Sequence, residues 1–249
     1  TPSFSLKYKR ALVSGASSGI GLACAVALCE RGASVTIAAR RKDKLKNLSN
    51  LLKKNGYSVE TITLDVSHTK KTIKKIQDLE PFDILVNSAG IAKHSLATES
   101  NEDDFDKVIG TNLKGAYFLT AAVAKKLAKF KKSGSLINIS SQMGLVGGQE
   151  RSVYSASKHA IEGFTKSMAI EFGPSNIRIN TICPTFILTD LTKPTFDDPK
   201  KRAWIEEKIK LGRVGRVEDI MGAVIFLASE ASALVTGSAL VIDGGWTAG

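Results

Sequence analysis

The sequence predicts an open, doubly wound α/β sheet of about seven parallel strands with helices on both faces. Short, almost entirely apolar runs alternate with helical patterns from one end of the chain to the other. Strands that are apolar throughout are typical of parallel sheets covered on both faces. A glycine-rich turn directly follows the first such run. No Pro/Ser-rich linker divides the 249 residues, so we expect one domain over 1–249.

Each element is assigned from its local pattern. Apolar runs predict strands over 11–13, 34–39, 59–64, 84–86, 136–139, 177–182 and 239–242. Helical patterns lie over 20–30, 42–55, 69–79, 104–130, 152–172 and 217–228, and the range 104–130 fits one long helix or two shorter ones. The longest irregular stretch, 184–200, contains three prolines, and we expect a lid loop there.

Composition fits a globular protein with a large core, because 43% of the residues are hydrophobic and 24% are charged. No run approaches the ~20 apolar residues that span a bilayer, and the first residues lack the apolar core of a signal peptide. Cys24, Cys29 and Cys183 show no zinc-site spacing, so we expect reduced thiols in a cytoplasmic protein. The histidines are scattered, and the sequence predicts no metal site.

The net charge of +11 comes largely from lysines on amphipathic helical patterns. Such lysines are typical of solvated helix faces. No aromatic-studded basic stripe accompanies them, so the sequence does not favour nucleic acid or a membrane as partner.

One pair of residues has the spacing expected of an acid/base site. Tyr154 and Lys158 stand four residues apart within a predicted helix, which puts both side chains on one face. An ammonium beside a phenol favours the phenolate, so we expect Lys158 to lower the pKa of Tyr154. A tyrosine adjusted in this way donates or accepts a proton near neutral pH.

A glycine-rich turn follows the first strand, in the order Ser14-Gly15-Ala16-Ser17-Ser18-Gly19-Ile20-Gly21. The glycines permit a tight turn, close approach of a diphosphate and close packing of the next helix on the sheet. A diphosphate would bind the free N–H groups at the start of that helix. The turn therefore predicts a dinucleotide site formed by Ser14, Gly15, Ser17, Ser18, Gly19, Ile20 and Gly21.

The end of the second strand selects the dinucleotide. An acid there would bind a ribose 2′-hydroxyl, but this chain has Ala38-Ala39-Arg40-Arg41. A guanidinium at Arg40 suits a 2′-phosphate, so we expect NADP(H) to be favoured over NAD(H). Asp65 and Val66, at the end of the third strand, are placed to meet the adenine.

Four spaced motifs now agree with a known family: Ser14–Gly21, Asn87–Gly90, Ser141 with Tyr154 and Lys158, and Pro184 with Thr189. The chain resembles the short-chain dehydrogenase/reductase family over essentially its full length. The resemblance implies a single Rossmann-type domain, a homotetramer or homodimer, and a small-molecule carbonyl or alcohol substrate. Thr185 departs from the family pattern, which usually has Gly after this proline.

The resemblance also implies residue roles. Tyr154 is similar to the family's acid/base, Lys158 to the residue that lowers its pKa and holds the nicotinamide ribose, and Ser141 to the serine that binds the substrate oxygen. Asn112 is similar to the asparagine that keeps a proton-relay water in place. Further residues are implied to contact the cofactor: Asn87, Ala89, Gly90, Pro184, Ile187 and Thr189.

The substrate is less well defined by the sequence. Lys93, His94, Gln149 and Arg151 lie in segments expected to border the carbonyl. The C-terminal Asp243-Gly244-Gly245-Trp246 resembles that of bacterial 3-oxoacyl thioester reductases and sugar-acid dehydrogenases. Two other classes of protein remain as alternatives, a catalytically idle dinucleotide-binding sensor and a basic surface-binding protein.

Overall fold

All seven expected strands form one parallel sheet in the computed structural model, which describes residues 1–249. The strand order is β3-β2-β1-β4-β5-β6-β7. The bounds are β1 (Arg10–Ser14), β2 (Ser34–Ala39), β3 (Val59–Thr63), β4 (Ile84–Asn87), β5 (Gly134–Ile139), β6 (Ile177–Pro184) and β7 (Ala239–Ile242). The predicted doubly wound sheet is therefore confirmed.

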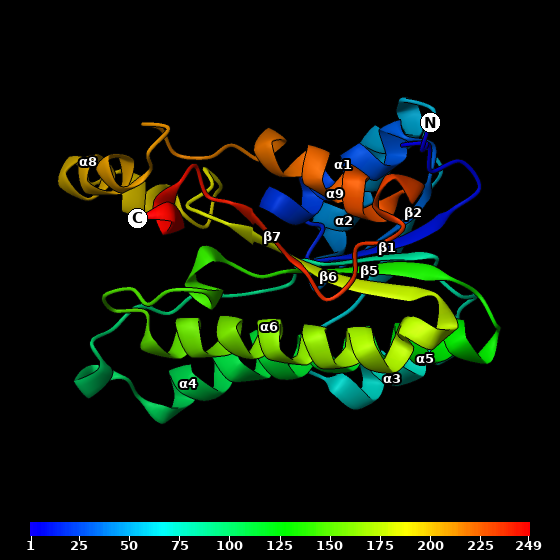
Figure 1. Ribbon diagram of the computed structural model, residues 1–249, viewed down its shortest axis with the longest axis horizontal. Coiled ribbons are helices and arrows are strands. Elements are labelled where there is room, and N and C mark those ends of the chain that lie inside the picture. Colours follow the sequence, from blue (N-terminus) through cyan, green and yellow to red (C-terminus); the bar gives the residue numbers. More distant parts are fainter.

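Helices cover both faces of the sheet, as Figure 1 shows. One layer holds α1 (Gly19–Glu30), α2 (Lys42–Lys54) and α9 (Glu218–Ala228). The opposite layer holds α3 (Thr69–Gln77), α4 (Glu102–Val108), α5 (Ala116–Lys129) and α6 (Ser152–Phe172). None of the helices combines the length and apolar character that crossing a bilayer requires.

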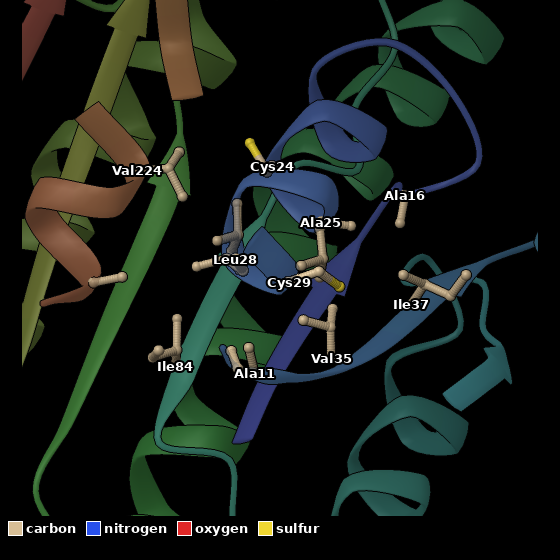
Figure 2. Close-up of a cluster of buried hydrophobic side chains, with 14 of the residues drawn as sticks. Ala11, Ala16, Cys24, Ala25, Leu28, Cys29, Val35, Ile37, Ile84 and Val224 are labelled. Carbon is tan, nitrogen blue, oxygen red and sulfur yellow. The ribbon is translucent and has the colours of Figure 1, made fainter. Parts of the chain in front are cut away.

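Two apolar cores hold these layers against the sheet. In the first, Leu28 of α1 and Val224 of α9 pack with Ala11 and Ile84 of the strands (Figure 2). The second lies under α3, α5 and α6 and includes Phe82, which is almost fully buried. The central strands β1, β2, β4, β5 and β6 contribute side chains to both cores, so most of their residues are apolar on both faces, which explains their apolar runs in the sequence.

The chain changes direction between β1 and β4. After β1 it builds β2 and β3 on one side, and it then returns to place β4 on the other side of β1. Ser14, the last residue of β1, is in register with Asn87, the last residue of β4. Helices leave these two strand ends toward opposite faces, which opens a crevice at the carboxyl edge of the sheet where ligands bind in such folds.

The predicted helical range 104–130 is interrupted. Between α4 and α5 the backbone forms a π-helical segment, η2 (Ile109–Gly115), which contains Asn112. Single π-turns inside helices are rare and occur frequently at functional sites. The sequence predicted the helical character of this range but not the change in helical pitch.

The stretch 184–200, expected to be an irregular lid, contains the helix α7 (Lys193–Phe196) and the start of α8 (Pro199–Lys208). Asp198 caps α8 by accepting hydrogen bonds from the backbone N–H groups of Lys200 (2.9 Å) and Lys201 (3.3 Å). Proline at the first helical position is favourable, because its missing N–H has no partner to lose there. We call residues 185–208 the lid segment.

Candidate active site

A cavity of about 500 Å³ occupies the crevice at the carboxyl ends of β1 to β5. Most residues predicted to bind a dinucleotide line it: Ser14, Gly15, Ser17, Ser18, Gly19, Ile20, Gly21, Arg40, Asp65, Val66, Ala89, Gly90, Tyr154, Lys158 and Thr189. Three do not. Asn87 is buried beneath the cavity, and Pro184 and Ile187 line a second cavity beside the first.

The glycine-rich turn has the shape that a diphosphate needs. Gly15 has a φ of +69°, and a Cβ there would lie 2.8 Å from the backbone N of Ala89. A Cβ on Gly21 would lie 2.5 Å from the carbonyl oxygen of Gly15. The first turn of α1 carries no acidic residue, and Ser18 makes no side-chain cap hydrogen bond. Its N–H groups therefore suit an anionic ligand.

Buried hydrogen bonds of the Asn87 side chain hold the start of the glycine-rich turn in place. Its side-chain oxygen accepts a hydrogen bond from the Ser14 hydroxyl (2.8 Å), and its amide donates to the carbonyl of Ala116 (3.1 Å). The Ser14 hydroxyl in turn accepts from the backbone N of Ala89 (3.2 Å). These bonds join the ends of β1 and β4 to the start of α5, so the cavity floor is fixed by buried hydrogen bonds.

Two guanidinium groups lie at the end of β2. Arg41, which the sequence prediction did not include, lines the cavity beside Arg40 and donates to the hydroxyls of Ser17 (2.8 Å) and Ser18 (3.0 Å). Burial acts to raise the pKa of Asp65. Hydrogen bonds from Ser67 and the charge of Arg40 outweigh burial and lower that pKa. Asp65 is therefore an anion on this wall at neutral pH.

Tyr154 and Lys158 project from α6 as the spacing predicts, but their electrostatics differ from the expectation. Burial raises the pKa of Tyr154, and the hydrogen bond with Ser141 and the charge of Arg151 only partly offset it. Lys158 Nζ donates to the carbonyl of Ile139 (2.9 Å) and lies 5.6 Å from the centre of the Tyr154 ring. The net direction is thus opposite to the one expected from the Tyr-Lys pair.

Lys158 itself is almost completely buried, with 5% of its surface exposed. Burial lowers the pKa of Lys158 to about 8, and the nearby Glu162 carboxylate acts in the other direction. Glu162, one turn further along α6, accepts hydrogen bonds from the Thr181 hydroxyl (2.8 Å) and the Cys183 thiol (3.3 Å). The negative charge of this buried carboxylate favours the protonated form of Lys158.

Asn112 in η2 faces the loop that follows β4. Its side-chain oxygen accepts from the N–H of Ile91, and its amide donates to the carbonyl of Ile91 and the hydroxyl of Ser157 (3.2 Å). Ser157 donates to the carbonyl of Tyr154 (2.7 Å). The structure therefore connects Asn112 to the helix that carries Tyr154 and Lys158.

A second cavity of about 330 Å³ opens between η3 (Gln142–Gly144) and the lid segment. Tyr154, Ser140, Ile20, Thr189 and Leu191 line both cavities. Ser141 lines only the second, and its hydroxyl accepts from the backbone N of Met143 (3.1 Å). Tyr154 thus stands on the boundary between the two spaces.

The structure brings only two of the four predicted substrate residues to this second cavity. His94 and Arg151 line it, whereas Lys93 and Gln149 do not. The Lys93 ammonium pairs with Asp104, 3.3 Å away, because the loop after β4 turns it toward α4. Burial lowers the pKa of His94 to about 4, with the charges of Arg151 and Lys201 adding to this effect and Glu150 opposing it. His94 is therefore neutral at physiological pH.

The lid segment is anchored by aromatic side chains. Trp246, near the C-terminus, contacts Phe186 and Trp204, with ring centres 5.6 Å apart in each pair. Phe186 also contacts Phe196 of α7. Phe196, Ile205, Ile209 and Val214 form a small buried core of their own. The roof of the second cavity is thus a packed structure and not an irregular loop.

Sequence reasoning missed several residues of these cavities. Arg41 was read together with Arg40 but not assigned a ligand. Thr185 was noted only for its backbone, although it lines the second cavity with Gln142 and Met143. Gln142 and Met143 directly follow Ser141, so their position next to the predicted serine was the available signal.

Comparison with known proteins agrees with this fold and site. A family model described as enoyl-(acyl carrier protein) reductase matches residues 15–247. The chain belongs to the short-chain dehydrogenase/reductase family. It is an oxidoreductase of that family, whose members act on CH–OH and C=O groups.

Individual relatives differ in the substrate that their names state. The chain is 39% identical over 241 residues to a 3-oxoacyl-(acyl-carrier-protein) reductase of Vibrio harveyi, covering 96% of this chain and 98% of the relative. It is 39% identical over 246 residues to a 2-dehydro-3-deoxy-D-gluconate 5-dehydrogenase of Bacillus subtilis, covering 98% and 96%. A gluconate 5-dehydrogenase of Burkholderia cenocepacia, solved with NADP and tartrate, superimposes with a TM-score of 0.96 at 32% identity, covering 99% and 98%.

Proposed function

We propose that the protein transfers hydride between NADP(H) and a carbonyl or secondary alcohol substrate, with Tyr154 as the acid/base. The observation that carries the proposal is the position of Tyr154. It lines both the larger cavity and the smaller one, next to Ser141 and Lys158. A proton donor between a cofactor space and a substrate space is what a carbonyl reduction requires.

The protein residues have separate tasks in this proposal. A bound nicotinamide supplies the hydride in reduction and accepts it in oxidation. The hydroxyls of Ser141 and Tyr154 stabilise the negative charge that develops on the substrate oxygen. Because burial raises the pKa of Tyr154, the phenol is protonated at neutral pH and is ready to donate. Lys158 lines the larger cavity with Tyr154, and Asn112 is hydrogen-bonded to α6 through Ser157; in this proposal both support the return of a proton to the tyrosine.

Preference for NADP(H) rests on the charges at the end of β2. Arg40 and Arg41 both line the cavity, and no carboxylate occupies position 39. The remaining acid on this wall, Asp65, accepts hydrogen bonds from the hydroxyl and N–H of Ser67. Guanidinium groups bind phosphate oxygens through charge-assisted hydrogen bonds. The Burkholderia relative solved with NADP supports the same choice.

For the substrate we propose an anionic small molecule. No Asp or Glu lines the second cavity, and Arg151 does. A 3-oxoacyl thioester of an acyl carrier and a sugar acid both carry negative charge, and relatives of both kinds exist. The cationic wall favours either through steering and charge-assisted hydrogen bonds. Charge alone does not choose between them.

We also propose a homo-oligomer, a tetramer or dimer, in the cytoplasm. Tyr117 of α5 is 40% exposed and packs edge-on against Phe118 and against Phe164 of α6. An aromatic face shared by two neighbouring helices suits a two-fold interface between identical chains. The three cysteines are unpaired and buried, which fits a reducing compartment.

The test is turnover of a carbonyl panel with NADPH and NADH side by side. The panel pairs anionic carbonyl compounds with neutral analogues of similar size, at low and high salt. We expect higher kcat/KM with NADPH and with the anionic members, and a smaller charge preference at high salt, because screening shortens the field. Absence of turnover with every compound and both cofactors would favour the alternative of an idle dinucleotide-binding sensor.

A further inference from the structure

The walls of the second cavity hold buried polar groups without partners. The side-chain nitrogen and oxygen of Gln142 and the hydroxyls of Thr185 and Ser140 form no hydrogen bond. All three residues line the second cavity. The fourth residue with an unpartnered buried group is Ser155, whose hydroxyl has no partner and which does not line the second cavity. Buried polar side chains without any partner are rare in folded proteins and need an explanation.

Gln142 is the most unusual of these residues because it is only 1% exposed. It begins η3, where its carbonyl accepts hydrogen bonds from the N–H groups of Leu145 (2.9 Å) and Val146 (3.1 Å). Ser141 caps the same turn. The backbone of Gln142 is thus held in place next to the catalytic serine while its side-chain amide lacks partners. A core position needing only volume would be filled better by an apolar residue.

Thr185 lies on the lid side of the same cavity. Its backbone N–H donates to the carbonyl of Ile242 (3.0 Å), so β7 holds its main chain. Its hydroxyl is buried and unpartnered, although the hydroxyls of Thr181 and Thr192 in neighbouring segments are hydrogen-bonded. An unpaired hydroxyl and an unpaired amide therefore belong to two different walls of one cavity.

The charged side chains that line the second cavity indicate which charge its ligand carries. Arg151 is the lining residue that carries a charge at neutral pH, because His94 is neutral and no carboxylate is present. A volume of about 330 Å³ lies near the lower end of the range for small-molecule sites. The space therefore suits a compact ligand with one anionic group and several neutral hydrogen-bonding groups.

We propose that Gln142 and Thr185 form a subsite for hydroxyl groups of the substrate, which is a short, hydroxylated oxo acid. This inference rests on the proposed function and assigns its substrate class. A hydroxyl both donates and accepts, so it satisfies an amide oxygen, an amide nitrogen or another hydroxyl. An alkyl chain, as in a 3-oxoacyl thioester, would leave the same groups unpaired, and such sites reject ligands that lack the matching hydroxyl. Arg151 would hold the carboxylate.

The test compares six-carbon oxo acids with and without hydroxyls: 2-keto- and 5-keto-D-gluconate against 2-oxohexanoate and 5-oxohexanoate. The parent protein should prefer at least one hydroxylated acid over its hydroxyl-free partner in kcat/KM. Gln142→Met and Thr185→Val should each reduce that preference roughly 3- to 10-fold, the effect of one net hydrogen bond. Ser155→Ala, which removes an unpartnered hydroxyl away from the cavity, should leave the preference unchanged.

Thermal unfolding provides a second readout. Replacing an unpaired buried polar group by an apolar one of similar shape is neutral or stabilising, so Gln142→Met and Thr185→Val should keep or raise the Tm of the parent. A clear fall in Tm in both variants would show that these groups are already paired and would overturn the proposal. Preference of the parent for the hydroxyl-free acids, or for a 3-oxohexanoyl thioester, would overturn it as well.

Failure of the proposed function would look different. If no carbonyl compound oxidises NADPH, binding of D-gluconate and hexanoate is measured by calorimetry instead. Tighter binding of gluconate to the parent, with the difference reduced in Gln142→Met and Thr185→Val but kept in Ser155→Ala, would support the subsite without any catalysis. Equal binding of the two acids would contradict it.

Discussion

The side chain of Asn112 forms hydrogen bonds to both backbone polar groups of Ile91, each 2.8 Å long. Asn112 is 1% exposed, and Ile91 belongs to the loop that follows β4. The side-chain amide of Asn112 therefore satisfies both backbone groups of Ile91, as a neighbouring strand would do in a sheet. Asn112 lies in the π-helical turn η2, which faces this loop. One residue thus connects the helix distortion to the position of the loop.

Asn112→Leu should lower the free energy of unfolding measurably. The substitution keeps the approximate volume but leaves the N–H and C=O of Ile91 without their partner, at about 1–3 kcal/mol for each buried group left unpaired. Chemical denaturation followed by circular dichroism measures the change. Asn112→Asp keeps the acceptor for the Ile91 N–H but replaces the donor to the Ile91 carbonyl by a buried carboxylate oxygen, so it should also destabilise the protein. A leucine variant as stable as the parent would mean that the loop does not depend on Asn112.

Tyr154→Phe should abolish most turnover while the protein stays folded. The variant keeps the ring and its packing but lacks the hydroxyl, so we expect the ~10²- to 10⁴-fold loss typical of a missing general acid. Steady-state kinetics and NADPH titration by fluorescence measure the two effects separately. Cofactor affinity should change little. Turnover equal to that of the parent would remove Tyr154 from the reaction.

Arg40→Ala and Arg41→Ala should each weaken NADPH binding more than NADH binding. Each removes a candidate charge-assisted contact to the 2′-phosphate, worth roughly 1.5–3 kcal/mol. Arg41→Ala also frees the hydroxyls of Ser17 and Ser18, which Arg41 contacts in the structure. Calorimetric titration of both variants with both dinucleotides separates the two arginines. Tighter binding of NADH than NADPH by the parent would refute the proposed preference.

The lowered pKa of Lys158 makes the free energy of unfolding depend on pH. Its pKa is about 8 in the folded protein, below the ordinary value near ~10.4, so the unfolded chain binds more protons between these values. Stability contributed by this group therefore rises with pH across that window. Below pH ~8 the burial of the charge costs up to roughly 3 kcal/mol.

Lys158→Met isolates this contribution. The variant should be more stable than the parent near pH 7, and the gap should narrow as the pH approaches 10. The buried thiol of Cys24 acts in the opposite direction, because burial raises its pKa to about 12, but it is common to both proteins and does not contribute to the pKa of Lys158, so it cancels in the difference. A gap that is constant from pH 7 to 10 would show that Lys158 titrates normally in the fold.

The exposed aromatic face of α5 and α6 predicts an assembly. Light scattering at micromolar concentration should give a multiple of the 26.6 kDa chain mass. Tyr117→Lys, which places a charge on this face, should shift the mass toward one chain while the fold is retained. A parent mass of one chain would contradict the proposed oligomer.

Much of this architecture is readable from the sequence, and the exceptions have physical reasons. Periodicity and the glycine-rich turn predicted all seven strands and the cavity at their carboxyl ends, because burial on both faces constrains most residues of the central strands. The π-turn at η2 was missed because a change of helical pitch leaves the apolar pattern almost unaltered. The helix α7 was missed because its proline suggested a loop, although proline is favourable in a first helical turn.

Properties that depend on side-chain environment were harder to predict. The spacing of Tyr154 and Lys158 was correct, yet the direction of the tyrosine pKa depends on burial, which spacing does not report. Lys93 was expected near the substrate but pairs with Asp104 on another helix. The position of Gln142 in the cavity could not be predicted, because a single glutamine forms no recognisable sequence pattern. Its importance appears only once its burial and missing partners are known.

The aromatic anchor of the lid segment has an experimental consequence. Both tryptophans of the chain, Trp204 and Trp246, belong to it, and they contact each other. Indole emission depends on the polarity and quenching groups around the ring, so the tryptophan emission of this protein arises entirely from the aromatic side chains packed on the lid segment. A ligand that changes the surroundings of either indole is therefore detectable without a label, and stopped-flow emission would measure the rate of that change.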